Sequence, residues 1–393
     1  MQNAFLTYED DFQLWVEGGF EPSKAETSEY LRFLADSDDE RQPRPGGLWR
    51  HQWEALLRIV YARECQGRSL WDDGLLVNIV TGGGKTALIA AVMVWLRLAY
   101  DVQRFLVLCP NLIVRDRLED DFQGGKVFTE RELIPPQSVV TAGDFALTTL
   151  GGDASATAAD LFGANVALAN IHQFYESNAA GKRNLAAFLG MNQTPFAVFN
   201  DEAHNTPAPE YDRTLNTLAR DGAMKFRLDT TATPDRADEK PIDSKMIYEY
   251  DIPAALNDRV IATPVVYQPS IEVVELTYTD AVTGDTRRVE EIDWEEVDRA
   301  GLTSTQWVTD SKPMSQQISI ACKRLDEARR NAAGRYRPIL FVVAVCKADA
   351  KQAQAMLESQ FGLKTLIVTE DQDEQARTEA ANIAKESKYD AVV

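Results

Sequence analysis

The sequence predicts an α/β fold whose centre is a parallel sheet covered by helices on both faces. Three observations predict it. From Leu48 onward, short continuous apolar runs alternate with helical stretches, which is the pattern of parallel strands buried on both sides. A glycine-rich turn follows the first of these runs and opens a helix. Each run stops at a polar cluster, and ligands of such sheets bind at the carboxyl ends of the strands.

The predicted strands of this sheet follow one another along the chain. They cover residues 75–80, 105–109, 166–169, 196–199 and 226–228. Helices are expected from the glycine-rich turn through Leu98 and from about Ile113 onward. Before the sheet, residues 12–18 and 28–34 fit short amphipathic helices, whose expected role is structural.

The chain changes character between Ile271 and Lys312, where it becomes rich in acidic residues. The elements predicted from here on are a hairpin of residues 273–278 and 286–291, a strand around 337–344, a helix to about 361 and a strand at 365–368. The apolar run that begins after Asp390 has the appearance of a strand cut off before its loop. We therefore expect a chain that is truncated at its C-terminal side.

These patterns divide the chain into three predicted segments. Residues 1–47 form an acidic N-terminal extension and linker that ends in a turn-rich stretch of proline and glycine. Residues 48–250 form the first domain, with the sheet. Residues 251–393 begin a second, incomplete domain that carries the acidic hairpin as an insertion.

Composition excludes some classes of protein but does not identify the function. The 393 residues are 45% hydrophobic, enough to bury two cores, and no apolar run is long enough to cross a bilayer. The four cysteines form no C-x-x-C pair, and the N-terminus lacks a secretory signal, so we expect a cytoplasmic protein without a cysteine zinc site. A net charge of −20 favours a small-molecule enzyme over a nucleic-acid binder. The motifs outweigh that preference.

The glycine-rich turn predicts a phosphate-binding loop. Gly82, Gly83 and Gly84 precede Lys85 and Thr86, between a strand and a helix. Glycines let successive N–H groups point at phosphate oxygens, and the helix N-terminus adds partial positive charge. Lys85 is expected to reach the β- and γ-phosphates of ATP, and Thr86 to bind Mg²⁺. The alternative is an ordinary glycine-rich turn. Ile79 stands where the longer form of this motif has glycine.

An acidic pair follows the strand at 196–199. Asp201 and Glu202 stand at its end, in the tetrad Asp-Glu-Ala-His that closes with His204. Asp201 is expected to hold Mg²⁺, and Glu202 to orient and deprotonate the attacking water. The alternative is a solvated acidic pair at a strand end, which is common. The phosphate loop upstream favours the catalytic interpretation.

With these residues in place, the chain resembles a superfamily 2 helicase of the DEAH-box type, most of all the Res (motor) subunit of type III restriction enzymes. The resemblance runs from about Leu48 to the end, and the first domain carries nearly all of it. It implies a P-loop NTPase with a RecA-like sheet, followed by an incomplete second RecA-like domain. It also implies that Gln52, in Leu48-Trp49-Arg50-His51-Gln52, reads the adenine edge.

The same resemblance implies a nucleic-acid track. Asn111 and Arg115, in a segment similar to motif Ia, are the expected phosphate contacts, together with Asn170 and His172 in a segment similar to motif Ic. Arg115 could equally be a solvated helix residue, and His172 a surface or core histidine. Thr231 and Thr233 stand in a segment similar to motif III, whose hydroxyls couple the two sites. Their alternative is a strand end that caps a turn before Pro234.

The function expected from the sequence is an ATP hydrolase, a helicase or translocase that uses ATP and Mg²⁺ to move on duplex or single-stranded DNA. The resemblance suggests a restriction or phage-defence enzyme, with a modification or specificity subunit as partner. Three alternatives stay open: a fragment that binds ATP and nucleic acid with little turnover, an RNA helicase, and a P-loop ATPase that acts on protein. The polymer that stimulates hydrolysis, if any, distinguishes them.

Overall fold

The computed structural model describes residues 8–35, 47–66, 74–110, 112–150, 160–190, 194–221, 224–234, 242–262, 276–279, 286–289, 311–369 and 388–393. Contacts divide the chain into two compact units, residues 1–263 and 264–393. Each unit is described by itself. Among the described residues, none of the helices combines the length and the apolar character that crossing a bilayer requires.

The first unit is built on a parallel sheet of seven strands in the order β3-β4-β2-β5-β6-β1-β7. The strands are β1 (Leu75–Ile79), β2 (Arg104–Cys109), β3 (Leu147–Leu150), β4 (Val166–Asn170), β5 (Phe196–Asp201), β6 (Met224–Thr231) and β7 (Lys245–Tyr250). The predicted α/β fold with a parallel sheet is therefore confirmed. The edge strands β3 and β7 were not predicted.

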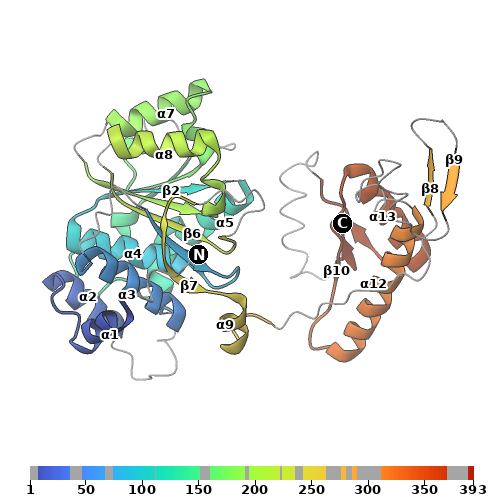
Figure 1. The fold of residues 1–393 in the computed structure, drawn as a ribbon, viewed down its shortest axis with the longest axis horizontal. Helices are drawn as coiled ribbons and strands as arrows, with labels where there is room; N and C mark the ends of the chain where they lie inside the picture. The colour runs from blue at the N-terminus through green and yellow to red at the C-terminus, as the bar shows by residue number, and fades with distance from the viewer. Residues whose placement is uncertain are drawn as a thin grey trace. The chain divides into compact units, whose positions relative to one another are not determined.

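Helices cover both faces of this sheet. They are α1 (Glu9–Glu17), α2 (Ala25–Ala35), α3 (Arg50–Glu64), α4 (Lys85–Tyr100), α5 (Leu112–Phe122), α6 (Lys126–Glu130), α7 (Ala179–Gly190), α8 (Pro209–Asp221) and α9 (Ile252–Asn257). Figure 1 shows α7 and α8 on one side of the sheet and α3 and α4 on the other.

Alternate residues of the central strands feed two separate cores. In β2, Phe105 and Val107 pack into the core on the α3–α4 side, whereas Leu106 and Leu108 pack into the core under α7 and α8. This alternation explains why residues 105–109 of the strand are all apolar: each face of the strand is buried. The buried faces hold the strands in a fixed register, so the residues at their carboxyl ends are also fixed.

The N-terminal helices α1 and α2 belong to the core of the first unit. Phe12 and Trp15 of α1 are buried and pack on Tyr61 of α3, with ring centroids 5.5 and 5.4 Å from it. Thr27 of α2 donates to Glu64 at the end of α3 over 2.7 Å. These helices thereby brace α3, the helix that begins beside the phosphate loop.

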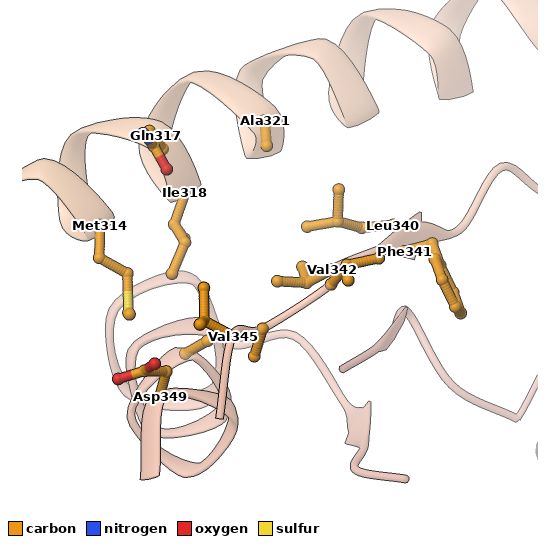
Figure 2. Close-up of a pocket in the computed structure, with 12 residues that line it drawn as sticks. Met314, Gln317, Ile318, Ala321, Leu340, Phe341, Val342, Val345 and Asp349 are labelled. Atoms are coloured by element: carbon orange, nitrogen blue, oxygen red, sulfur yellow. The ribbon is translucent and has the colours of Figure 1, made fainter. Parts of the chain in front are cut away.

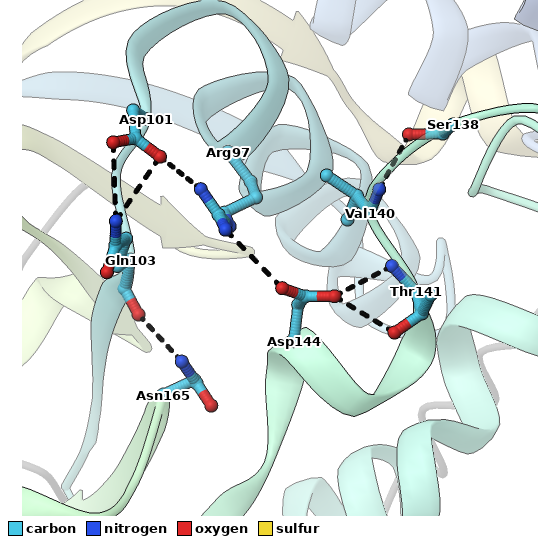
Figure 3. Close-up of polar contacts among 8 residues, drawn as sticks. All are labelled: Arg97, Asp101, Gln103, Ser138, Val140, Thr141, Asp144 and Asn165. Carbon is cyan, nitrogen blue, oxygen red and sulfur yellow. Dashed lines mark hydrogen bonds and ion pairs between the residues drawn. The ribbon is translucent and has the colours of Figure 1, made fainter.

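Polar contacts fix the far end of α4 (Figure 3). Arg97 lies 3.4 Å from Asp144, whose carboxylate accepts hydrogen bonds from the backbone N–H and the hydroxyl of Thr141. The Thr141 N–H bond, helped by the hydroxyl and by Arg97, holds the pKa of Asp144 below its usual value. Asn165, before β4, donates to the Gln103 carbonyl over 3.2 Å.

The second unit contains a small parallel sheet in the order β10-β12-β11. Its elements are β10 (Leu340–Phe341), β11 (Thr365–Leu366), β12 (Ala391–Val392), α12 (Ser311–Ala332) and α13 (Lys347–Phe361). The predicted strand that follows Asp390 is present as β12, the central strand. Asp390 itself accepts hydrogen bonds from Arg329 and Arg337.

The predicted acidic hairpin is also present, as the antiparallel pair β8 (Leu276–Thr279) and β9 (Thr286–Val289). Its turn, Thr283-Gly284-Asp285, lies outside the described residues. A separate apolar pocket of about 260 Å³ opens between α12, α13 and the segment that begins with β10 (Figure 2). Met314 and Ile318 line it from the helix α12, and Val342 lines it from the segment after β10.

Candidate nucleotide site and nucleic-acid interface

The phosphate loop lies between β1 and α4, as predicted. Gly82 and Gly84 adopt left-handed backbone conformations, with φ of 86° and 76°. At Gly83 a Cβ atom would lie 2.5 Å from the side chain of Ile79. Each of the three positions therefore requires glycine for a local reason. Gly84 is the N-cap of α4, so the helix begins at Lys85 and its first N–H groups have no partner within the helix.

Two side chains from the start of α3 hold this loop. Gln52 accepts a hydrogen bond from the Trp49 N–H over 2.8 Å, and donates to the carbonyls of Gly83 at 2.9 Å and Gly84 at 3.1 Å. His51 Nε2 lies 2.7 Å from the same Gly83 carbonyl. The structure thus places Gln52 on the loop itself, and its reading of adenine stays a prediction.

The acidic pair stands at the end of β5, next to the loop. Asp201 is only 7% exposed and accepts a hydrogen bond from the Thr230 hydroxyl over 2.9 Å. Burial raises the pKa of Asp201, while the nearby Lys85 ammonium opposes that shift. Lys85 Nζ lies 3.5 Å from Glu202 Oε1. The two motifs, far apart in sequence, therefore meet in one site.

The backbone of Glu202 differs from that of Asp201, the last residue of β5. The Glu202 backbone lies in the left-handed region, with φ of 54°, which turns the chain sharply after the strand. Its second oxygen lies 3.5 Å from His204 Nδ1. A non-glycine residue in this region stores strain of about 1–3 kcal/mol, and such residues cluster at functional sites.

The predicted coupling residues contact the acidic pair through His204. The Nδ1 atom of His204 lies 3.1 Å from the Thr231 hydroxyl and 3.3 Å from the Thr233 hydroxyl. The Thr231 hydroxyl also accepts a hydrogen bond from the Thr233 N–H over 3.1 Å. A continuous polar chain therefore links Lys85, Glu202, His204 and the end of β6.

The oxygen atoms here fit a magnesium ion. Mg²⁺ binds through one or two protein oxygens, phosphate oxygens and water, and needs no dedicated protein cage. Thr86 and Asp201 offer a hydroxyl and a carboxylate on neighbouring elements. Across the described ranges, no group of three or more His, Cys, Asp or Glu side chains forms a separate metal site. That Thr86 and Asp201 hold a nucleotide-bound Mg²⁺ stays a prediction.

Two of the residues predicted to touch nucleic acid, Asn170 and His172, lie at the end of β4. Asn170 accepts a hydrogen bond from the His172 N–H at 3.0 Å, and its Oδ1 atom lies 2.7 Å from His172 Nδ1. It also donates to the Pro110 carbonyl at 3.1 Å. Asn170 thereby joins the two segments, while His172 is exposed.

Arg115 occupies a more buried position than a phosphate contact requires. It is 4% exposed, and its Nε and Nη2 atoms donate to Asp116 over 2.9 and 2.6 Å. Its contact with a phosphate stays a prediction that requires the side chain to turn outward. Asn111 lies outside the described residues.

A buried polar network behind the acidic pair was not predicted. Asp229 is fully buried and takes two hydrogen bonds from Arg227, at 3.1 and 2.7 Å. Asn200 donates to Asp229 over 2.5 Å and accepts from the Tyr211 hydroxyl at 3.2 Å. Asn200 and Asp229 stand within the largely buried strands β5 and β6, next to the two motifs. Their polarity at buried positions could have indicated this network.

Comparison with known proteins shows which family part of the chain resembles. Residues 47–236, just under half of the chain, match the sequence model of the family described as "Type III restriction enzyme, res subunit". The match begins at the linker and ends just after the motif that contains Thr233. Residues 47–236 therefore resemble the Res subunit of type III restriction enzymes. The predicted resemblance is thereby confirmed.

Solved structures resemble the chain at low sequence identity. The UvsW helicase from Bacteriophage T4 is 12% identical, with a TM-score of 0.37, over 62% of this chain and 78% of its own. The Sulfolobus solfataricus SWI2/SNF2 ATPase core, in complex with dsDNA, is 13% identical, with a TM-score of 0.39. That overlap covers 91% of this chain and 80% of the SWI2/SNF2 core.

Mss116p, bound to ssRNA and AMP-PNP, is 12% identical with a TM-score of 0.47. That overlap covers 97% of this chain and 65% of Mss116p. No protein of curated function matches the chain in sequence. Because these TM-scores are below 0.5, the resemblance to the Res subunit rests on the sequence match alone.

Proposed function

We propose that this chain is the ATP-hydrolysing motor of a DNA helicase or translocase, of the kind that serves a restriction or phage-defence enzyme. The contact between Lys85 and Glu202, at 3.5 Å, is the observation that carries the proposal. It joins a phosphate-binding cation to a carboxylate that can act on water. A site that only bound phosphate would not need the second group.

Each side chain then has a separate task. Lys85 and the first N–H groups of α4 bind the β- and γ-phosphates. Thr86 and Asp201 hold Mg²⁺, which neutralises charge on the phosphates when it is bound. Glu202 takes a proton from the attacking water. Because the Lys85 ammonium lies beside Glu202, bound phosphate must compete for that ammonium, and this would release Glu202 for the water.

The polar chain through His204 supports coupling to a track. His204 touches Glu202 on one side and the hydroxyls of Thr231 and Thr233 on the other. A change at the γ-phosphate can therefore reach the end of β6. The proposed track contacts are the exposed His172, the asparagine that positions it, and, after rearrangement, Arg115 and Asn111.

The proposed partners are DNA and a modification or specificity subunit. We further propose that residues 251–393 begin a second RecA-like motor domain, whose sheet includes β10, β11 and β12. In the proposed cycle, ATP hydrolysis beside Lys85 and Glu202 would drive movement of the strand past Asn170 and His172.

Displacement assays test the kind of motor. With ATP and Mg²⁺, the full-length protein should displace a third strand from a DNA triplex if it translocates on duplex DNA. It should separate a duplex if it is a helicase. Displacement of RNA strands only would assign an RNA track. Failure of every displacement, in a protein that hydrolyses ATP, would overturn the motor function.

A further inference from the structure

We infer that His51 and Tyr250 form a clamp that turns the amides of the phosphate loop toward the nucleotide. The two rings are stacked, with centroids 4.0 Å apart and planes inclined by 4°. His51 is 3% exposed and Tyr250 4%. Nε2 of this histidine lies 2.7 Å from the Gly83 carbonyl. The inference rests on the proposed nucleotide site and adds positioning residues to it.

The chemistry of the contact fixes the position of a proton. A carbonyl oxygen can only accept, so Nε2 of His51 must carry the hydrogen that lies between them. Burial lowers the pKa of His51, which favours the neutral ring. The neutral ring donates through Nε2 alone. A histidine in this state is a fixed donor, placed by the ring beneath it.

The direction of the carbonyl decides the direction of the next amide. In a trans peptide the C=O and the N–H point to opposite sides. Holding the Gly83 carbonyl toward α3 therefore turns the Gly84 N–H away from α3. Gln52 acts in the same way on the Gly84 carbonyl and hence on the Lys85 N–H. Gly83 itself is tied at both ends, since its N–H donates to the Val80 carbonyl at 2.9 Å.

Tyr250 connects this clamp to the segment that leads toward the second unit. It ends β7, and its carbonyl accepts a hydrogen bond from the Val80 N–H at 3.0 Å. Its hydroxyl donates to Asp258 at the end of α9, also over 3.0 Å. The residues after α9 lead to the boundary between the units near Thr263. The clamp thus ties the nucleotide loop to the connecting segment.

A purely packing role for these rings predicts different behaviour. Stacked buried aromatics stabilise the fold by about 0.5–1.5 kcal/mol beyond their buried area, wherever they lie. In that case their loss lowers stability, while the bound nucleotide is affected only through unfolding. The clamp predicts weaker nucleotide binding in protein that is still folded.

The experiment measures the affinity for a fluorescent ATP analogue with Mg²⁺, together with thermal unfolding of each variant. His51→Phe keeps the stack and removes the donor. Tyr250→Ala removes the stack, and Tyr250→Phe keeps it. The matched control is Tyr248→Ala, since Tyr248 is an equally buried tyrosine of β7 whose hydroxyl reaches Glu54. Lys85→Ala serves as the reference for a lost nucleotide site.

The clamp predicts about fivefold to tenfold weaker binding for His51→Phe, the effect of one lost buried hydrogen bond. Tyr250→Ala should weaken binding similarly, and Tyr250→Phe, which keeps the stack, should weaken it less than Tyr250→Ala does. Tyr248→Ala should lose stability but keep its affinity. If Tyr250→Ala does not fold, His51→Phe decides.

Two contrary results have different meanings. Wild-type affinity in folded His51→Phe, with binding lost in Lys85→Ala, would overturn the clamp and leave the nucleotide site intact. Unchanged binding in Lys85→Ala would overturn the proposed site itself. Equal losses in Tyr248→Ala and Tyr250→Ala would also overturn the clamp, because they would indicate general damage to β7.

Discussion

The carboxyl edge of the large sheet has two regions that are organised in opposite ways. At the ends of β1, β5 and β6, side chains from distant segments contact one another, as in the pair Lys85–Glu202. Beside the ends of β2 and β4, side-chain pairs are formed between sequence neighbours: Asn170 binds His172, and Arg115 of α5 binds Asp116, while Asn170 also reaches the Pro110 carbonyl. The first region therefore brings ionisable side chains together from distant segments, whereas the described side chains of the second are braced by partners nearby.

The two regions suit two kinds of ligand, a small molecule and a polymer. A small ligand such as ATP needs several groups held at fixed distances, which the central strands of a sheet provide. A polymer can be bound through a few exposed groups and backbone amides. That arrangement also agrees with a net charge of −20, since the track would require only local contacts. Four substitutions test whether the two regions have separate roles, from the largest expected effect to the smallest.

The largest effect is expected at the water-activating carboxylate. Glu202→Gln keeps the size of the side chain but removes the base, so ATP hydrolysis by the full-length protein should fall about 10³-fold. Nucleotide affinity should stay within a few fold. Glu176→Gln, at an exposed position before α7, is the control. Hydrolysis that persisted in Glu202→Gln would remove the carboxylate from the mechanism.

The next largest effect is on nucleotide binding. Lys85→Ala removes a cation from the phosphates, and a charge-assisted contact of this kind is worth about 3 kcal/mol. Affinity for ATP should therefore fall about 100-fold or more. The exposed Lys182→Ala on α7 should bind ATP like the wild type. An unchanged affinity in Lys85→Ala would mean that this loop does not bind phosphate.

A smaller effect is expected in the second region. His172→Ala removes the exposed side chain that Asn170 positions, and DNA affinity should fall about fivefold, a loss of about 1 kcal/mol. ATP affinity should not change, which would separate the two regions. Arg183→Ala tests whether any exposed cation has the same effect. Equal losses in both variants would indicate that DNA responds only to overall charge.

The smallest effect concerns stability, away from both regions. Asp144→Ala removes the two bonds from Thr141, at a cost of about 1 kcal/mol in the free energy of unfolding. Because the pKa of Asp144 is lowered in the fold, this stabilisation is present above its ordinary pKa and is lost as the pH falls through the folded value.

Thermal unfolding of Asp144→Ala at neutral and acidic pH checks both parts of that prediction. The difference from the wild type should shrink as the pH falls. Asp101→Asn alters an exposed residue that contacts Arg97 and Gln103, and it should change stability by less than about 0.5 kcal/mol. A difference that grew toward acidic pH would contradict the assigned role of the carboxylate.

Sequence alone predicted the centre of the sheet better than its edges. β2 and β5 contain the continuous apolar runs 105–109 and 196–199 because both of their faces are buried, so these runs identified them. The edge strands β3 and β7 escaped prediction. Thr148 and Thr149 interrupt the first, and Glu249 interrupts the second, because an edge strand is less fully covered than a central one.

The nucleotide site could be predicted for a related reason. Its residues stand next to one another in short motifs, so Lys85 with Thr86 and Asp201 with Glu202 are visible in sequence. Tyr250 was not predicted, because its contact with His51 joins segments about 200 residues apart and follows from sheet order alone. The pairing of Arg115 with Asp116 is a choice of side-chain conformation, which no spacing rule determines.

The most direct test of the proposed function is ATP hydrolysis by the full-length protein, with and without duplex DNA, single-stranded DNA and RNA. The prediction is Mg²⁺-dependent hydrolysis that DNA stimulates and that Glu202→Gln stops. Stimulation by RNA alone would change the track but keep the motor. Hydrolysis that no polymer stimulates would contradict the central claim, because the site at β1, β5 and β6 would then work without the region at β2 and β4.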